Sequence, residues 1–187
     1  MQEKLNEIAL LKLIEKKSDV LYGLYDAAQG VNLLDEFQKN GISHDCLFSG
    51  IKEITLRDVA PYLFSCHQFG KNSEYFTNNI WKKGVSMLLE GAEPMEKIKF
   101  QLKKNTYVKN SKNAECYFRY YDARAFSRFM RIANAGQLDQ LFGSAIQTIY
   151  WLDVKTNGIV GLNKKRSSFI DRFLDSGSSN YNILKFS

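Results

Sequence analysis

The pattern of hydrophobic and polar positions changes its period within one stretch of the chain, AECYFRYYDARAFSRFMRIA at residues 114–133. From 115 to 121 bulky side chains point alternately to two faces, which predicts a strand. Because both faces carry large side chains, we expect this strand to lie in the interior of a sheet. After Asp122 the apolar positions follow the spacing of a helix. These positions are Phe126, Phe129, Met130 and Ala133.

Asp122 occupies the position of a helix N-cap, where its carboxylate can accept hydrogen bonds from the backbone of Arg124 or Ala125. The outward side of the same helix carries a basic stripe. Its members are Arg124, Arg128 and Arg131. Two interpretations of this corner stay open. In one, Asp122 pairs internally with Arg119 or Arg124 and holds strand to helix; in the other, these side chains contact a partner.

The remaining periodicity divides the chain into short helices and strands. Helices are predicted at 3–17, 33–37, 72–81, 94–104 and 137–142. Strands are predicted at 20–25, 44–48, 62–64, 85–89, 106–109, 146–154 and 159–162. The strand–helix–strand order of residues 20–48 indicates a parallel pair, whereas 106–109 and 115–121 form a predicted hairpin. The expected fold class is α+β (mixed α/β), a single domain with a mixed sheet flanked by helices.

The chain divides into three expected parts. Residues 1–19 form an N-terminal helix that docks on the domain, and residues 20–145 form the main domain. Residues 146–187 form a small C-terminal extension, a hairpin that turns at Asn157-Gly158 followed by a polar tail. This tail contains SGSSN at 176–180 and a turn of helix at 169–174. We expect it to be mobile or to await a partner.

Composition indicates a folded protein without a membrane span. Of the 187 residues 44% are hydrophobic, which is enough apolar material for a sizeable core, and only two are prolines. No apolar run approaches the roughly 20 residues that a bilayer requires. The first residues are acidic where a signal peptide would be cationic, so a cytoplasmic location is expected. Three cysteines, an odd number, fit a reducing compartment, and we expect Cys46, Cys66 and Cys116 to be buried thiols.

The net charge of +6 raises the question of a nucleic-acid partner. The basic residues fall in several short groups, and no nucleic-acid-binding motif connects them. We therefore expect solvated faces and no nucleic-acid partner, and keep a basic nucleic-acid-binding domain as the alternative function.

The residues that could support catalysis or hold a metal are better explained structurally. Cys66 and His67 are adjacent in the chain, and neighbours in an extended segment point to opposite faces, so their side chains cannot readily pair. The other histidine, His44, has no metal-ligand spacing around it. We predict no catalytic residue, no metal and no cofactor.

Two carboxylates near aromatic strands, Asp26 and Asp122, could act as the acid pair of a glycosidase. Each has a simpler role as a helix cap, however, and Arg119 and Arg124 are placed to neutralise them. A hydrolase is therefore a less favoured alternative.

An ordered series of short motifs resembles a known family. The series is Tyr22 with Asp26-Ala27, LFSG at 47–50, APYL at 60–63, FRYYDAR at 118–124 and LFG at 141–143. It resembles domain of unknown function 4123, found in effector chaperones, or adaptors, of bacterial type VI secretion systems. The family has Asp-Pro-Arg where this chain has Ala123 in the middle, a mild departure because proline at the first helical position is dispensable. The motif residues are Tyr22, Asp26, Pro61, Phe118, Arg119, Tyr121, Asp122, Arg124 and Gly143.

The resemblance implies a non-catalytic cytoplasmic adaptor of a bacterium. Such a protein binds a secreted toxic effector, often through the effector's N-terminal region, and helps to load it onto the trimeric spike protein. It would act by burying apolar effector segments over roughly 800 Å² or more per partner. Tyrosine and arginine are favoured in interface hot spots. The candidate partner-binding residues are therefore Tyr117, Arg124, Arg128 and Arg131.

Overall fold

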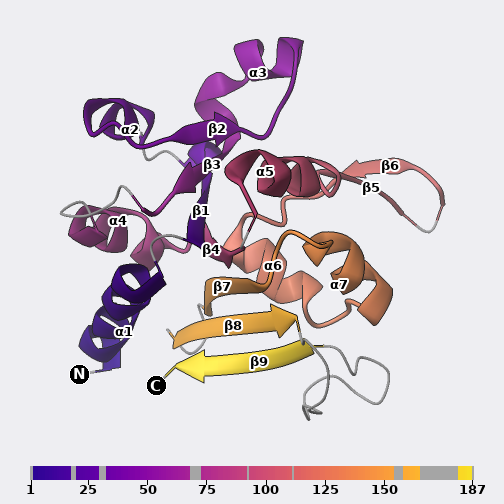
Figure 1. Ribbon diagram of the computed structural model, residues 1–187. Coiled ribbons are helices and arrows are strands. Elements are labelled where there is room, and N and C mark those ends of the chain that lie inside the picture. Colours follow the sequence, from indigo (N-terminus) through magenta and orange to yellow (C-terminus); the bar gives the residue numbers. More distant parts are fainter. Residues whose placement is uncertain are drawn as a thin grey trace.

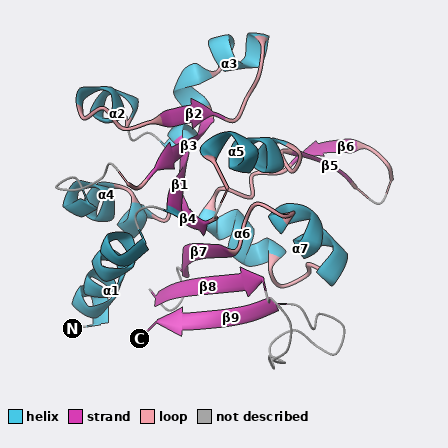
Figure 2. Cartoon of the chain, viewed as in Figure 1, coloured by secondary structure: helices cyan, strands magenta, loops and turns pink. Residues whose placement is uncertain are grey.

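An antiparallel sheet of seven strands runs through the middle of the molecule, with helices on both of its faces (Figures 1 and 2). The computed structural model describes residues 2–17, 20–29, 33–67, 73–91, 93–110, 112–153, 158–164 and 181–186. For residues 2–9 and 181–186 it describes the backbone alone.

The strands of the large sheet lie in the order β2-β3-β1-β4-β7-β8-β9. Their bounds are β1 Leu21–Asp26, β2 His44–Cys46, β3 Pro61–Ser65, β4 Ser86–Glu90, β7 Thr148–Asp153, β8 Gly158–Lys164 and β9 Tyr181–Phe186. A separate two-stranded sheet consists of β5 Tyr107–Lys109 and β6 Glu115–Tyr117. Each described strand pairing is antiparallel.

Helices form a layer on each face of the large sheet. The α-helices are α1 Gln2–Lys17, α2 Leu34–Lys39, α3 Ile51–Thr55, α4 Ser73–Asn79, α5 Met95–Lys103, α6 Ala123–Phe129 and α7 Ala135–Phe142. Short 3₁₀ turns are η2 Ala27–Gln29, η3 Arg57–Val59 and η5 Trp81–Lys83. In Figure 1, α1, α2 and α4 lie on one side of the sheet and α5, α6 and α7 on the other. The helix α3 projects at one end.

Strand alternation explains why the core has two halves. In β1 the buried side chains of Leu21 and Tyr25 join the cluster that packs under α1, α2 and α4, and Leu24 joins the other cluster. That second cluster includes the fully buried Phe126 of α6. Burying a side chain of this size contributes roughly 1.5–3 kcal/mol relative to leaving it exposed. Each face of the sheet thus anchors its own helical layer.

The N-terminal helix docks on the sheet through apolar and charged contacts. Leu10 and Ile14 of α1 are buried. At its last residue, Lys17 Nζ lies 2.6 Å from Glu90 Oε2, and Tyr150 donates a hydrogen bond to the same carboxylate over 2.8 Å. Burial disfavours the charged form of Glu90, but the hydrogen bonds from Lys17 and Tyr150 outweigh it and lower the pKa of this carboxyl.

The predicted α+β class with a single helix-flanked domain is confirmed. The prediction of a parallel pair, and hence of a mixed sheet, is wrong. Strand β3 lies between β1 and β2 and pairs antiparallel with both. The connection from β2 through α3 brings the chain back beside β1, so the sheet is antiparallel.

The segment 115–121 was expected to be one interior strand, and this prediction is wrong. Only β6, its first three residues, is a strand, and it pairs only with β5 among the described strands. Residues 118–121 turn into the core, where Tyr120 and Tyr121 are buried. The heavy aromatic content reflects this turn, since it packs rings against the helices. Cys116 is half-buried, unlike the buried Cys46 and Cys66.

Beyond residue 145 the chain continues the large sheet. Strand β7 pairs with β4, β8 with β7, and β9 with β8. The predicted hairpin of 146–154 with 159–162 is therefore confirmed, and β9 is a strand that the sequence pattern did not indicate. The helical turn predicted at 169–174 and the SGSSN segment lie outside the described residues. The boundaries drawn at residues 19 and 145 stay predictions.

Among the described helices, none is both long and apolar enough to cross a bilayer.

Candidate functional site

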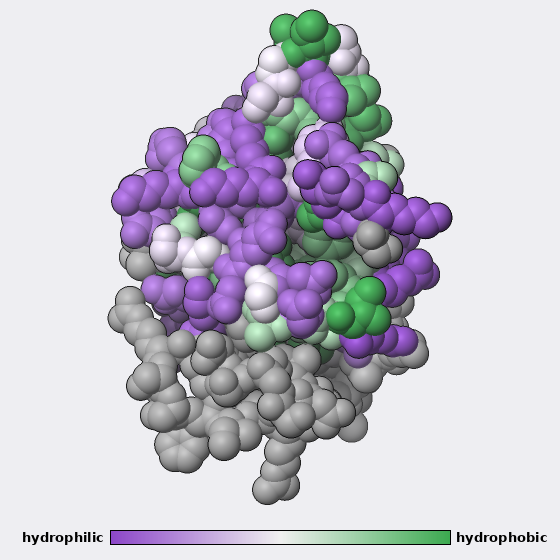
Figure 3. All heavy atoms as spheres, turned by 90° about the vertical axis from the view of Figure 1, so that its right-hand side faces the viewer, coloured by the Kyte–Doolittle hydropathy of each residue, from purple (hydrophilic) through white to green (hydrophobic). Residues whose placement is uncertain are grey.

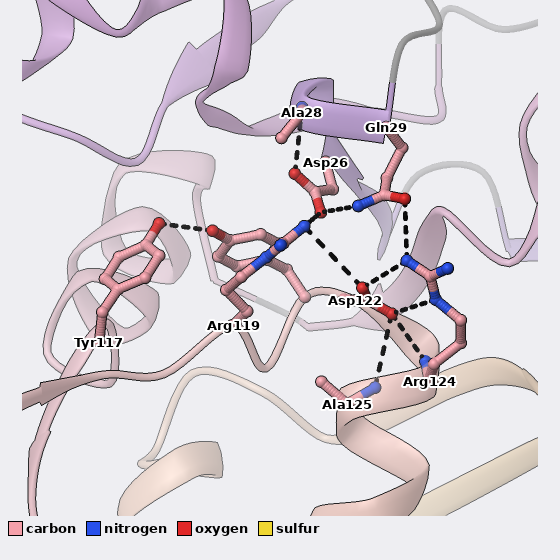
Figure 4. Close-up of polar contacts among 9 residues, drawn as sticks. Asp26, Ala28, Gln29, Tyr117, Arg119, Asp122, Arg124 and Ala125 are labelled. Atoms are coloured by element: carbon pink, nitrogen blue, oxygen red, sulfur yellow. Dashed lines mark hydrogen bonds and ion pairs between the residues drawn. The ribbon is translucent and has the colours of Figure 1, made fainter.

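The acids and arginines that the sequence singled out meet in one charged cluster, at the place where β1 ends and α6 begins (Figure 4). Asp26 is the last residue of β1 and Asp122 is the N-cap of α6. Arg119 reaches toward both acids from the turn before α6. The cluster therefore joins two elements that are nearly a hundred positions apart in the chain.

Asp26 is fully buried, and its carboxylate accepts three donors. The backbone N–H of Ala28 lies 3.2 Å from Oδ1, and the side-chain amide of Gln29 lies 3.2 Å from Oδ2. The guanidinium of Arg119 pairs with the same Oδ2. Burial opposes the charge of Arg119, but the hydrogen bond and the negative charge of Asp26 outweigh it and raise the pKa of this arginine. Asp26 is thus a paired buried charge.

Asp122 caps α6 as predicted. Its Oδ1 accepts from the backbone N–H groups of Arg124 at 2.9 Å and Ala125 at 3.4 Å, two groups that have no partner within the helix. The side chain of Arg124 also donates two hydrogen bonds to this carboxylate, from Nε to Oδ1 over 3.0 Å and from Nη2 to Oδ2 over 2.8 Å. Burial raises the pKa of Asp122, but these hydrogen bonds more than offset it, so the net pKa is lowered. Asp122 is held ionised.

Gln29 connects the two halves of the cluster, and no sequence motif singled it out. Its amide nitrogen donates to Asp26, and its Oε1 accepts from Arg124 Nη2 over 2.8 Å. The only local signal is its position three residues after Asp26, in the turn that this acid caps. The contact with Arg124 depends on the tertiary structure, so no sequence pattern points to it.

Two tyrosines extend the cluster toward the hairpin. The hydroxyls of Tyr117 and Tyr121 lie 2.5 Å apart. Burial and the hydrogen bond with Tyr117 raise the pKa of Tyr121, and burial also raises the pKa of Tyr117. The ring of Tyr117 packs against Phe48 and Tyr107, with centroid distances of 5.9 Å and 5.5 Å. Tyr117 therefore connects the ion pairs to the surface around α3.

The remaining motif residues support the fold around the cluster. Tyr22 donates to the backbone oxygen of Glu93 over 3.2 Å, and Pro61 lies opposite Asp26 in the β1–β3 register. Phe118 packs on Phe129 with ring centroids 4.9 Å apart. Gly143 ends α7 with φ of +54°, a left-handed conformation that favours glycine.

The predicted basic stripe divides between two roles, and α6 ends at Phe129, so Arg131 lies in the turn after the helix. Arg124 belongs to the ion-pair cluster, although its outer edge stays exposed. Arg128 and Arg131 are exposed and lie outside the cluster. The apolar stripe packs inward as predicted, with Phe126 fully buried and Phe129 and Met130 packed against the core.

The arrangement is suited to holding structure and not to acid–base catalysis. A glycosidase needs one carboxyl that keeps its proton near neutral pH. Asp122 has a lowered pKa, and Asp26 is paired with an arginine. Within the part of the chain that the structure describes, no three histidine, cysteine or acidic side chains are grouped to hold a metal. Burial raises the pKa of the Cys66 thiol, which disfavours a thiolate nucleophile.

Comparison with known proteins identifies one relationship. The sequence profile of a family described as "Domain of unknown function (DUF4123)" matches residues 21–140. Neither the curated proteins nor the solved structures yield a match. The matched segment begins at the first residue of β1 and ends within α7, so it contains the entire ion-pair cluster. Because the profile covers more than half of the chain, the protein belongs to the family of domain of unknown function 4123.

Proposed function

We propose that this protein is a cytoplasmic, non-catalytic adaptor that binds a type VI secretion effector and helps to load it onto the trimeric spike protein. Its support from the sequence is the ordered series of motifs that resembles such adaptors, which lies almost wholly within the matched segment 21–140. Those motifs build the fold and the ion-pair cluster. The binding surface therefore has to be sought among exposed side chains.

The observation that carries the proposal is an exposed apolar surface on α3 and η3. Ile51 and Ile54 are 78% and 79% exposed, and Leu56 and Val59 are also exposed. Figure 3 shows hydrophobic side chains gathered at the end of the molecule that α3 forms in Figure 1. Exposed apolar groups that gather in this way mark protein–protein interaction sites. This segment lies between the LFSG and APYL motifs, within the matched family region.

The charged cluster favours an adaptor over a hydrolase. Both carboxylates are occupied by donors from the protein itself, and each pairs with an arginine. Such a cluster fixes the corner between β1 and α6 but offers no protonated acid for general acid catalysis.

A nucleic-acid-binding domain is less well supported. Of the three arginines in the predicted basic stripe, Arg124 is neutralised by Asp122. On α5, Lys97 and Lys99 are paired with Glu93 and Asp45. Phosphate binding needs several unpaired cations on one face. Binding to DNA that persists at physiological salt would instead favour this alternative.

Co-expression with a candidate toxin, sought among the genes next to that of this protein, tests the adaptor function. We expect the toxin to become more soluble, to elute with this protein in size-exclusion chromatography, and to lose secretion when the adaptor is deleted. Unchanged solubility and secretion without this protein, together with the absence of a complex, would contradict the proposal.

Charge reversal on α6 tests the candidate contacts. Arg128→Glu leaves the ion-pair cluster intact, so its melting temperature should stay at the wild-type value while capture of the toxin is lost. Lys83→Glu, an exposed lysine of η5, is the matched control and should capture the toxin normally. Equal capture by both variants would exclude Arg128 from the interface.

A further inference from the structure

A groove lies between the α3 segment, the C-terminal end of α5 and the start of β5. Its volume is about 410 Å³. Leu47 and Phe48 contribute buried apolar surface to it, and Ile51 and Tyr107 contribute exposed side chains. The groove adjoins the family motifs, since Leu47 and Phe48 belong to LFSG and the ring of Phe48 packs on Tyr117, the residue before FRYYDAR. A groove that combines such apolar side chains is the form of a site that accepts the apolar side chains of a partner segment.

Two lysines stand at this groove without a carboxylate. Lys52 Nζ donates to the hydroxyl of Tyr107 over 2.5 Å, and Lys103 Nζ donates to Ser49 Oγ over 2.6 Å. Both acceptors are neutral. Among the described residues, neither ammonium group pairs with an acid.

Other lysines of the same region differ in this respect. On α5, Lys97 lies 2.8 Å from Glu93 and Lys99 lies 2.7 Å from Asp45. Lys103 is one turn further along the same helix and donates to a serine hydroxyl. The hydroxyls thus hold two positive charges beside an apolar floor, and the lining of the groove contains no acid to compensate them.

We propose that this groove binds an acidic amphipathic segment of a protein partner. Apolar side chains of the segment pack against Leu47, Phe48 and Ile51, and its carboxylates pair with Lys52 and Lys103. The identity of the partner rests on the proposed function: the segment belongs to the effector that the adaptor carries.

The composition of the groove favours protein over nucleic acid. A nucleic-acid strand gains most of its affinity from many phosphate contacts, and two lysines supply few. The apolar floor would contact phosphate and sugar poorly, whereas an amphipathic helix presents apolar anchors to such a groove. The flanking lysines then select for acidic residues beside those anchors.

A synthetic peptide provides the direct test. The probe carries leucines at positions i, i+3, i+4 and i+7 with glutamates on both flanks, and its counterpart carries lysines instead of the glutamates. We expect the full-length protein to bind the acidic peptide at least about tenfold more tightly than the basic one in fluorescence anisotropy. Equal binding of the two peptides would overturn the inference.

Variants place the binding in the groove. The double variant Lys52→Glu/Lys103→Glu should bind the acidic peptide at least about tenfold more weakly than wild type. It should bind the basic peptide more tightly, since the charges are exchanged. Ile51→Ser should lower the affinity for both peptides. The matched controls are Lys83→Glu and Ile132→Ser, the latter replacing an isoleucine that is 82% exposed elsewhere. Wild-type affinity in the groove variants, with melting temperatures unchanged, would overturn the inference.

Two further measurements distinguish the groove proposal from a nucleic-acid site and from the adaptor function. Tighter binding of single-stranded DNA than of the acidic peptide at physiological salt would identify a nucleic-acid site and overturn the inference. If wild type and Lys52→Glu/Lys103→Glu capture the toxin equally, the adaptor function stands and the groove proposal fails. If wild type captures no toxin but binds the acidic peptide through the groove, the groove stands and the adaptor function fails.

Discussion

The guanidinium of Arg119 pairs with the fully buried carboxylate of Asp26, across a sequence separation of 93 residues. This contact ties the end of β1, in the middle of the large sheet, to the turn that leads into α6 (Figure 4). It also places Arg119 within 3.9 Å of Asp122, so the two acids share one arginine. The cluster is therefore the point at which the aromatic turn is fixed to the sheet.

Arg119→Ala should destabilise the protein strongly. The substitution leaves the carboxylate of Asp26 buried without its cation, and we expect a loss of about 2–3 kcal/mol in the free energy of unfolding. Asp26→Asn should cost less, because the amide oxygen can still accept from Ala28 and the half-exposed Arg119 can be hydrated. Urea denaturation of both single variants and the double variant measures the coupling. Additive losses would show that the pair contributes nothing of its own.

Asp122 should make stability depend on pH. Its pKa in the folded state is lower than the ordinary value of 3.8. At a pH near these two pKa values, the unfolded chain therefore binds more protons than the folded one. The stabilisation is therefore present at neutral pH and is lost as the pH falls below 3.8 toward the lowered pKa.

Asp122→Asn keeps an oxygen for the cap but cannot ionise, which isolates this effect. Between about pH 6 and about pH 3, wild type should lose more free energy of unfolding than Asp122→Asn. Glu90, whose pKa is also lowered, contributes equally to both proteins and does not affect the difference. Denaturant titrations at each pH provide the measurement, and parallel pH profiles would contradict the prediction.

Gly23→Ala should disrupt the centre of the sheet. Gly23 lies opposite Phe64 in the β1–β3 register, and an added Cβ would overlap the Phe64 ring. That ring cannot move aside easily, because it packs on Phe37 and Phe76 at centroid distances of 4.8 Å and 5.7 Å. We expect a loss of about 1–3 kcal/mol by thermal or urea unfolding.

A second substitution checks the cause of this loss. In a Phe64→Leu background the smaller side chain makes room, so Gly23→Ala should then cost distinctly less. An equal cost in both backgrounds would mean that steric overlap with Phe64 is not responsible.

Asn134→Ala should remove the capping box of α7. Asn134 accepts from the backbone N–H of Gln137 over 2.9 Å, and the Gln137 side chain accepts from the backbone N–H of Asn134 over 3.0 Å. Loss of such a cap costs about 1 kcal/mol. Asn134→Ser retains an acceptor and should cost distinctly less. If the two variants have the same melting temperature, the cap does not stabilise α7 as the geometry indicates.

Part of the cluster could be predicted from local sequence, and part could not. The N-cap role of Asp122 depends only on residues two and three positions ahead, so the sequence identified it correctly. The pairing of the acids with Arg119 and Arg124 was one of two interpretations, and the structure brings these groups together. Gln29 was missed because its second contact, with Arg124, joins positions 95 apart.

The errors in the fold have related causes. Alternation over 115–121 was interpreted as one interior strand, but the same spacing arises where aromatic rings of a turn enter the core. The order of β1, α2 and β2 was interpreted as a parallel pair, because local order does not show that β3 inserts between the two strands. Neither α3 nor its exposed isoleucines were expected, since so short a helix has hardly any periodicity of its own.

By itself the sequence determined the α+β class, most helices and strands, the cap of α6 and the motifs of its family. These features depend on periodicity and on contacts between near neighbours in the chain. Only the tertiary structure decided the strand order, the ion pair between Asp26 and Arg119, and the groove with its two lysines. Each of these requires residues about 50 to 90 positions apart to meet, and such meetings are set by packing of the whole core and not by local preference.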